Sequence, residues 1–369
     1  MFKNAGIIFV AVLFLAGCAS APNVPQEVVE PTPAANGVSA LNWSSGKASV
    51  FEANQPSELS PQNPTPIAPV KPSIPPVMTW TSLANWAAEH KVGKPHLISS
   101  TPVSSYAIGS ANGVMILTIG SHSATWNGVE INLGFDPQII DGEIYLHGLD
   151  LQKNLEPLLC EPPLTFPQGN RVIVIDPGHG GSNIGTHSVL DGRFEKEFTL
   201  DWAKRIKPLL ETNGWKVFLT RDSDTYVTNA NRVVFAAAHR ADLFISLHFN
   251  SAAPDTKQAG LETYCFTPAG MPSTLTRGYS DPWSERLSSD DFDAQNLQLA
   301  VKMQSALLHA IGMEDRGVRH VRYIEVLRNQ KCPAILIEGG YLSNPTEAKL
   351  IESADYRQKL AEAFAAALK

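Results

Sequence analysis

"VIVIDPGHGG", the stretch from Val172 to Gly181, decides the fold of this 369-residue chain. Its first four residues are β-branched, and a short apolar run bounded by turn residues is typical of a strand buried on both faces of a sheet. An Asp-Pro-Gly turn then ends the strand. His179 therefore follows the carboxyl end of the strand, which is where open α/β sheets bind their ligands.

The sequence after residue 169 continues with alternating helix and strand patterns. Phe198, Trp202 and Ile206 recur at helical spacing after the first strand, which predicts an amphipathic helix. Further strand patterns lie at 215–221, 241–250 and 334–340, and further helix patterns at 230–239, at 294–312 and from residue 346 onward. This alternation predicts an α/β domain with a mostly parallel sheet flanked by helices on both faces.

Three more polar residues occupy positions like that of His179. Glu195 lies just before the first helix, His248 ends the apolar run "LFISLH", and Glu338 ends the apolar run "AILIE". Taken singly, such a carboxylate is more often a helix cap or a structural acid. Parallel strands bring their carboxyl ends to one edge, however, so all four side chains are expected to converge there.

Two histidines and two glutamates at one edge of a sheet predict a zinc site with an additional acid. Catalytic zinc takes three nitrogen or oxygen ligands and leaves a fourth position open for water. The cysteines offer no competing site, because their spacing contains no paired CxxC pattern.

Five motifs in this region resemble those of a known family. They occur in the order IDPGHGG, EKEFTLD, LTRDSD, ADLFISLHFNS and PAILIEGGYLSNPTEAKL across residues 169–369. Together they resemble the zinc-dependent N-acetylmuramoyl-L-alanine amidases, the type 3 amidase family of peptidoglycan hydrolases. The resemblance implies hydrolysis of the amide bond between N-acetylmuramic acid and L-alanine, with Zn²⁺ as the cofactor and peptidoglycan as the substrate.

The resemblance also implies a role for each of the four polar residues. The family's zinc ligands fall on His179, Glu195 and His248, and its catalytic acid/base falls on Glu338. Glu197 lies two residues beyond Glu195 and matches a second acid of the motif that is not a ligand.

Two other functions remain as alternatives. A zinc carboxypeptidase-type hydrolase of the peptidoglycan stem peptide could use the same kinds of ligand, although the ordered motifs are those of the amidases. A non-catalytic cell-wall-binding lipoprotein with a decayed site is the other alternative. All four site positions are filled, which argues against decay.

Residues 267–293 form an insertion rich in Pro, Gly, Ser and Asp. Long segments of this kind without strong periodicity are usually functional or disordered. Some members of the amidase family carry a helix here that covers the zinc until a partner removes it, so a protein activator is a candidate partner. The insertion lacks a long helical pattern, and we favour a wall of the substrate cleft over an inhibitory plug.

The N-terminus resembles a bacterial lipoprotein signal peptide over residues 1–18. Lys3 precedes a short apolar run, and the run ends in a lipobox-like Leu-Ala-Gly-Cys with Cys18 as the lipidation site. An ordinary secretory signal with a chance cysteine is the alternative. The residue that follows Cys18 is Ala19 rather than Asp, which resembles lipoproteins sent to the outer membrane. We therefore expect a cell-envelope lipoprotein that faces the periplasm and is held to the membrane by its lipid.

The remaining sequence divides into linkers and two folded regions. Asn-Gly and Asp-Gly hairpin signals within a series of short strand patterns predict a small β-rich domain. It resembles the stalk domain related to the N-terminal domain of copper amine oxidases, and its role as a spacer or a glycan binder stays open. The expected divisions are a Pro-rich linker at 19–77, the β-rich domain at 78–159, a second linker at 160–168 and the catalytic domain at 169–369.

Overall charge excludes one class of partner. The chain has a formal net charge of −7 and no run of basic residues. Duplex binding requires clustered Lys and Arg to neutralise phosphates, so we expect no nucleic-acid partner.

Overall fold

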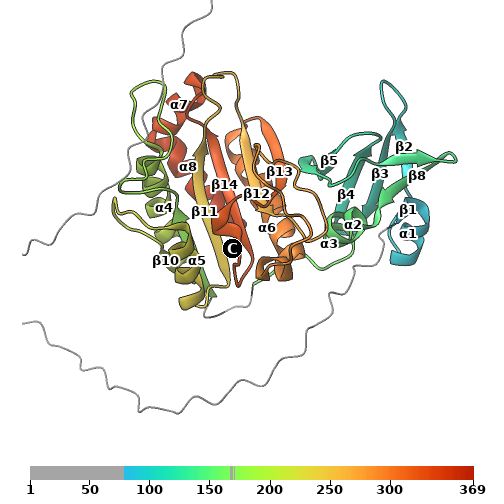
Figure 1. Cartoon of the computed structure of the whole chain (residues 1–369), viewed down its shortest axis with the longest axis horizontal. Coiled ribbons are helices and arrows are strands. Elements are labelled where there is room, and N and C mark those ends of the chain that lie inside the picture. The colour runs from blue at the N-terminus through green and yellow to red at the C-terminus, as the bar shows by residue number, and fades with distance from the viewer. Residues whose placement is uncertain (1–78, 167–168, 170) are drawn as a thin grey trace, which may run out of the picture. The chain divides into compact units, whose positions relative to one another are not determined.

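The computed structural model describes residues 79–166, 169 and 171–369 (Figure 1). The predicted signal peptide, the lipidation site Cys18 and the linker at 19–77 lie outside these residues. No helix in the described part of the chain is both long and apolar enough to cross a membrane.

Most strands belong to an 11-stranded sheet. In spatial order these strands are β10 (Trp215–Leu219), β9 (Arg171–Pro177), β11 (Leu243–Asn250), β14 (Ala334–Tyr341), β12 (Leu261–Phe266), β13 (Asp315–Val321), β6 (Val129–Asn132), β5 (Ser123–Trp126), β4 (Gly113–Thr118), β3 (Ser105–Ser110) and β2 (His96–Ser99). A second sheet contains β1 (Trp80–Ser82), β8 (Glu143–His147) and β7 (Gln138–Ile140).

Helices and short helical turns connect these strands. In chain order they are α1 (Leu83–His90), α2 (Gly148–Asp150), η1 (Leu151–Leu155), α3 (Glu156–Leu159), α4 (Glu195–Thr212), α5 (Asn229–Ala238), η2 (Ser288–Phe292), α6 (Asp293–Ile311), η3 (Glu325–Leu327), α7 (Pro345–Glu352) and α8 (Ala354–Ala367).

The prediction of a mostly parallel sheet was wrong in one respect, because the sheet is mixed. β10, β9, β11 and β14 run parallel, but β12 pairs antiparallel with β14 and parallel with β13. The chain passes from β11 to β12 through residues 251–260, which contain no helix. A parallel return needs a crossover of a dozen or more residues, so this short loop brings β12 back in the opposite direction.

Different helices pack on the two faces of the sheet. Successive side chains along a strand point alternately to one face and to the other. Ile173 and Ile245 belong to the apolar cluster that includes residues of α4, α6 and α8. Val174 and Phe244 belong to the cluster that includes α5 and η3. Because successive side chains point to opposite faces, even-numbered positions of β9, β11 and β14 project toward the α5 side.

The predicted hairpins of the N-terminal region are present. Asn127-Gly128 joins β5 to β6, and Asp141-Gly142 joins β7 to β8. All four turn residues have positive φ, from 48° at Asn127 to 85° at Gly128. Two consecutive positive φ angles are the requirement of the type I′ turn, which matches the twist of the strands that it connects.

β6 joins the N-terminal strands to the rest of the sheet through β13. Ile131 is the register partner of Val318 in this parallel pair. The backbone N–H of Glu130 donates to Asp315 Oδ2 at 2.7 Å, and Asn132 Nδ2 donates to the carbonyl oxygen of Val318 at 3.3 Å. Hydrogen bonds that involve side chains thus reinforce the short backbone pairing between β6 and β13.

Trp202 gives a test of the packing between α4 and the sheet. Its side chain is fully buried and lies 5.4 Å from the ring of Phe249 on β11. We expect Trp202→Ala to lower the free energy of unfolding by about 3–5 kcal/mol, because the cavity cannot fully collapse. Urea unfolding measures the change, and Lys204→Ala on the exposed face of α4 is the control. A loss below about 1 kcal/mol would contradict this packing.

Candidate metal centre and cleft

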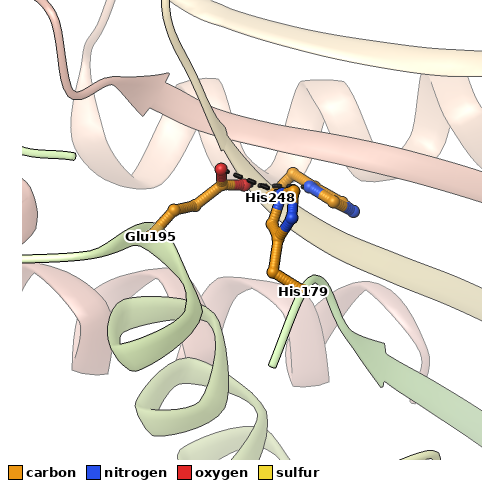
Figure 2. Close-up of side chains that lie close together, drawn as sticks. All are labelled: His179, Glu195 and His248. Atoms are coloured by element: carbon orange, nitrogen blue, oxygen red, sulfur yellow. Dashed lines mark hydrogen bonds and ion pairs between the residues drawn. The ribbon is translucent and has the colours of Figure 1, made fainter. Parts of the chain in front are cut away.

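Three predicted site residues come together at the carboxyl ends of the central strands. Figure 2 shows His179, Glu195 and His248 pointing toward one another, His179 from the loop after β9, Glu195 from the start of α4 and His248 from β11. Their ligand atoms all lie within 4.8 Å of one another. Glu195 Oε2 is 3.0 Å from His179 Nε2, and Glu195 Oε1 is 2.9 Å from His248 Nδ1. Among the described residues, these three form a group that could hold a metal ion.

Glycines allow the chain to bring these side chains so close. A Cβ atom on Gly178 would lie 2.3 Å from His248 Cε1, and one on Gly185 would lie 2.5 Å from Glu195 Oε2. His179 itself has a φ of 62°, which is uncommon for a residue with a side chain. The glycine-rich sequence around His179 therefore serves close packing at the cluster.

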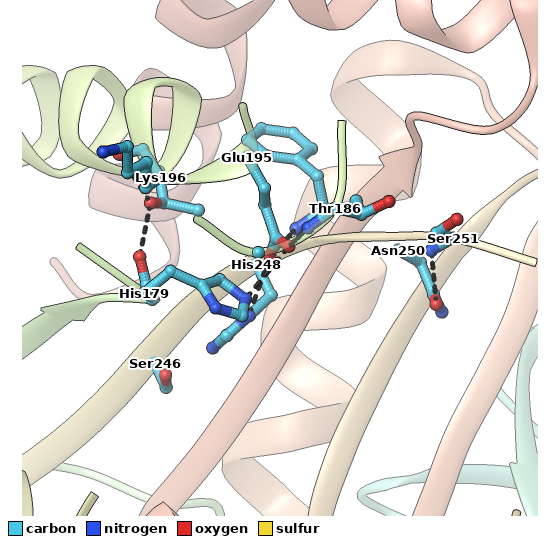
Figure 3. Close-up of polar contacts among 12 residues, drawn as sticks. His179, Thr186, Glu195, Lys196, Ser246, His248, Asn250 and Ser251 are labelled. Carbon is cyan, nitrogen blue, oxygen red and sulfur yellow. Dashed lines mark hydrogen bonds and ion pairs between the residues drawn. The ribbon is translucent and has the colours of Figure 1, made fainter. Parts of the chain in front are cut away.

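Glu195 is held by the backbone as well as by the histidines. Its Oε1 accepts from the N–H of Phe249 at 3.1 Å, and its Oε2 accepts from the N–H of Thr186 at 3.0 Å. Figure 3 shows Glu195 between Thr186 and His248. Glu197 instead accepts from the N–H of Phe194 at the start of α4. The structure thus places the first acid of the motif with the histidines and the second at a helix cap.

The cluster favours a negative charge on Glu195. Burial raises the pKa of this carboxyl, but hydrogen bonds and charge from His179 and His248 lower it below its ordinary value. Burial lowers the pKa of His179, whereas the hydrogen bond and charge of Glu195 outweigh it and raise the pKa. A buried carboxylate between two imidazoles is a donor set that suits a divalent cation.

Asn183 orients one of these rings, and sequence reasoning missed it. Its Oδ1 lies 2.8 Å from Nδ1 of His179, so this nitrogen donates to the amide and Nε2 remains on the side of Glu195. Such partners fix the tautomer and direction of metal-binding imidazoles. The only sequence signal was an asparagine four residues after His179 in a glycine-rich loop.

Two buried arginines hold the loop that carries His179. Arg221 Nη2 donates to the carbonyl oxygen of Gly178 at 2.8 Å, and Arg232 Nη2 donates to that of His179 at 2.7 Å. Arg232 also pairs with Asp176, which is fully buried at the end of β9. Both guanidinium groups are bound to groups of the protein itself. They therefore fix the loop and are not free to bind a substrate.

Glu338 lies beside the cluster and lacks its own partners. It is the register partner of His248 across β11 and β14. Its Oε2 is buried and has no hydrogen-bond partner within the described residues. Burial raises the pKa of Glu338 well above its ordinary value, the charges of Glu195 and Glu262 raise it further, and Arg277 opposes them. An unpaired buried carboxyl with a raised pKa in a cleft is typical of an acid/base.

Glu262 on β12 is the register partner of Glu338 on its other side, and it is fully paired. The hydrogen-bond donors to its carboxylate are Arg316, Arg319, Asn250, Tyr264 and Tyr341. The two neighbouring glutamates therefore differ. Glu262 is neutralised by its donors, whereas Glu338 Oε2 has no hydrogen-bond partner within the described residues.

These residues line a cleft of about 570 Å³. His179, Glu195, His248 and Glu338 all contribute to it, together with Asn229 and Arg232 of α5. The insertion at 267–293 contributes Arg277 and Tyr279 to the lining. Its helical element before α6 is the short turn η2, which does not line the cleft. The structure thus agrees with the interpretation of this segment as a wall of the cleft.

A two-histidine, one-carboxylate cluster in a cleft of an α/β domain defines a class of metal-binding hydrolase sites. Comparison with known proteins then gives the family. The sequence profile of the N-acetylmuramoyl-L-alanine amidases (Amidase_3) matches residues 173–369, which is more than half of the chain. The chain therefore belongs to this family, and the family prediction from the sequence is confirmed.

The chain is also similar to individual amidases. The chain is 28% identical over 218 residues to the N-acetylmuramoyl-L-alanine amidase AmiA of Escherichia coli (strain K12), covering 53% of this chain and 74% of that protein. It is 32% identical over 201 residues to LytC of Bacillus subtilis (strain 168), covering 54% of this chain and 35% of that protein. The solved structure of AmiC2 of Nostoc punctiforme is 30% identical, with 55% of this chain and 97% of that chain covered and a TM-score of 0.45.

The raised pKa of Glu338 predicts a pH-dependent cost to the stability of the metal-free protein. Between the ordinary glutamate pKa of about 4.3 and the raised folded-state pKa, the native state keeps a proton that the unfolded state has lost. Stability therefore falls as pH rises through this window, by up to about 1.4 kcal/mol per pH unit. Glu338→Gln cannot titrate, so its stability relative to wild type should increase as the pH rises above about 5.

Urea unfolding of the zinc-free proteins across this pH range measures the difference. The matched control is Glu211→Gln, because Glu211 is exposed on α4 and should leave the wild-type pH dependence intact. Parallel stability curves for wild type and Glu338→Gln would show that Glu338 is not destabilised by its burial.

Proposed function

We propose that the protein hydrolyses the amide bond between N-acetylmuramic acid and L-alanine in peptidoglycan. The observation that carries the proposal is the meeting of His179, Glu195 and His248 with the unpaired Glu338 in one cleft. The family to which the chain belongs is named for this reaction.

We propose zinc as the metal, with His179, Glu195 and His248 as its ligands. Two imidazole nitrogens and one carboxylate oxygen are a common set for catalytic zinc, and the ligand atoms already face one another. When bound in such a site, zinc lowers the pKa of a water molecule toward 7 and polarises the carbonyl group to be attacked. One carboxylate neutralises only half of the metal's charge, so the site stays electrophilic.

Glu338 is the proposed general base and general acid. As the carboxylate it accepts a proton from the attacking water, and it then gives this proton to the leaving nitrogen of L-alanine. Its position next to His248 in the sheet supports this role, because it lies near the cluster without belonging to it. Within the described part of the chain, Oε2 has no hydrogen-bond partner, which leaves this oxygen available for the proton.

We also propose that the protein acts in the cell envelope. The curated relatives are amidases, and cell-wall cleavage requires access to peptidoglycan. The lipobox-like sequence at Cys18 supports a lipid anchor, and the Pro-rich residues 19–77 supply a spacer between membrane and enzyme. The proposal also includes anchoring of the protein in the outer membrane and control of its activity by an activator protein.

Product analysis tests the reaction directly. The protein beginning after Cys18 is incubated with purified peptidoglycan, with and without a chelator, and the products are identified by mass spectrometry. We expect stem peptides with a free L-alanine amino group, formed only when zinc is present. Peptides shortened at their carboxyl ends would instead indicate a carboxypeptidase, and intact walls with zinc bound would contradict the proposal for the isolated protein.

Two variants separate metal binding from catalysis. Glu338→Ala should keep one zinc per chain and lose turnover by about 10²- to 10⁴-fold, because it removes only the proton transfer. His179→Ala should lose the zinc, because it removes a ligand. Elemental analysis of the purified variants and their turnover on peptidoglycan measure both effects. Substantial zinc-dependent activity in Glu338→Ala would refute the role of Glu338, and full zinc in His179→Ala would refute that of His179.

A further inference from the structure

Arg277 in the insertion is the feature of the cleft that the proposed reaction does not use. Its side chain lines the cleft and is 38% exposed. Both of its hydrogen bonds use Nη2, which donates to Asn250 Oδ1 at 3.2 Å and to Tyr264 Oη at 3.1 Å. Within the described residues Nε and Nη1 make no hydrogen bond, so two sides of the guanidinium remain free.

Within the described residues, Arg277 makes no hydrogen bond to a charged group. Its acceptors on Asn250 and Tyr264 are neutral, and its ion pair with Glu262 Oε2 is long, at 4.0 Å, beyond hydrogen-bond distance. Glu262 is already paired with Arg316 at 2.8 Å. Arg232, the other arginine that lines the cleft, is bound to Asp176 and to backbone carbonyls.

The insertion holds Arg277 in place. Asp281 accepts hydrogen bonds from the N–H and the hydroxyl of Ser273 at 2.7 and 2.8 Å. The N–H of Thr274 donates to the carbonyl oxygen of His320 on β13 at 2.9 Å. On the other side, Tyr279 stacks on Tyr323 with ring centroids 5.1 Å apart, and both rings line the cleft. The guanidinium is therefore presented by an anchored segment beside an aromatic wall.

Its place beside the metal cluster fits one part of the proposed substrate. Arg277 contacts Asn250, which lies two residues beyond His248 on β11, a backbone spacing of roughly 7 Å at about 3.3 Å per residue. In the stem peptide, the residue after L-alanine is a D-glutamate whose α-carboxyl is either free or amidated. That carboxyl belongs to the next residue along the peptide from the scissile amide, as Arg277 belongs to the next part of the cleft from the cluster.

We propose that Arg277 is a specificity residue that binds the free α-carboxylate of the second stem-peptide residue. This inference rests on the proposed function, because it assumes a peptidoglycan stem in the cleft. Arginine suits this task, since its planar donors match both oxygens of a carboxylate. An amidated second residue replaces the anion with a neutral group and forfeits the charged hydrogen bonds. Arg277 thereby selects walls in which this carboxyl is unmodified.

The test pairs protein variants with substrates that differ in one group. Two muramoyl tripeptides are used, one with a free and one with an amidated D-glutamate α-carboxyl. Arg277→Gln should lower kcat/KM for the free-acid substrate by about 10- to 100-fold, mainly through KM, and change it less than about twofold for the amide. Arg277→Lys should fall between, because it keeps the charge and loses the planar geometry. Arg286→Gln is the matched control, since Arg286 lies in the same insertion, is exposed and pairs with Asp291.

A purely structural role, or an effect through Glu338, predicts a different pattern. Either would reduce cleavage of both substrates equally, and that result would overturn the proposal. Equal cleavage of both substrates by wild type and Arg277→Gln would overturn it while leaving the amidase function intact. Failure of wild type to release L-alanine from either substrate would overturn the proposed function and this inference together. Calorimetric binding of both substrates to zinc-loaded Glu338→Gln gives a second readout, in which the free acid must bind more tightly and lose that advantage with Arg277→Gln.

Discussion

Parallel pairing of β9, β11 and β14 is the constraint on which the site depends. It aligns three strand ends at one edge, so that His179 follows β9 while His248 and Glu338 become register partners. Even-numbered positions project toward the α5 side of the sheet, where the carboxyl ends of these strands line a cleft. Glu195 at the start of α4 then completes the cluster from a separate element. A one-residue shift of β11 or β14 would turn His248 or Glu338 to the opposite face.

Some charged groups around this edge are fully paired with other groups of the protein, and others keep polar atoms without a partner among the described residues. Arg232 is buried with Asp176, and Glu262 is surrounded by donors, so these groups fix positions. Glu338 and Arg277 keep unused polar atoms in the cleft. Unpaired buried groups reduce stability, and functional sites are where proteins retain them. The distinction separates the residues that build the cleft from those assigned to substrate.

Much of the fold and the core of the site could be predicted, because both depend on local sequence patterns. His179 and Glu338 follow apolar runs that form strands at the predicted places, and the Asn-Gly and Asp-Gly turns form the predicted hairpins. The strands β12 and β13 were not among the predicted strands. The antiparallel direction of β12 depends on a loop too short for a crossover rather than on a motif. Asn183 and Arg277 were missed as site residues for a related reason. Their contacts cross between segments that no periodicity relates.

The central claim is that His179, Glu195 and His248 together hold a zinc ion beside Glu338. Anomalous X-ray scattering at the zinc absorption edge, from crystals of the purified protein, tests it most directly. The account predicts one anomalous peak per chain, in contact with all three side chains and with Glu338 outside the coordination sphere. A peak at another place, a peak bound by Glu338, or no zinc after saturation with the metal would contradict the account.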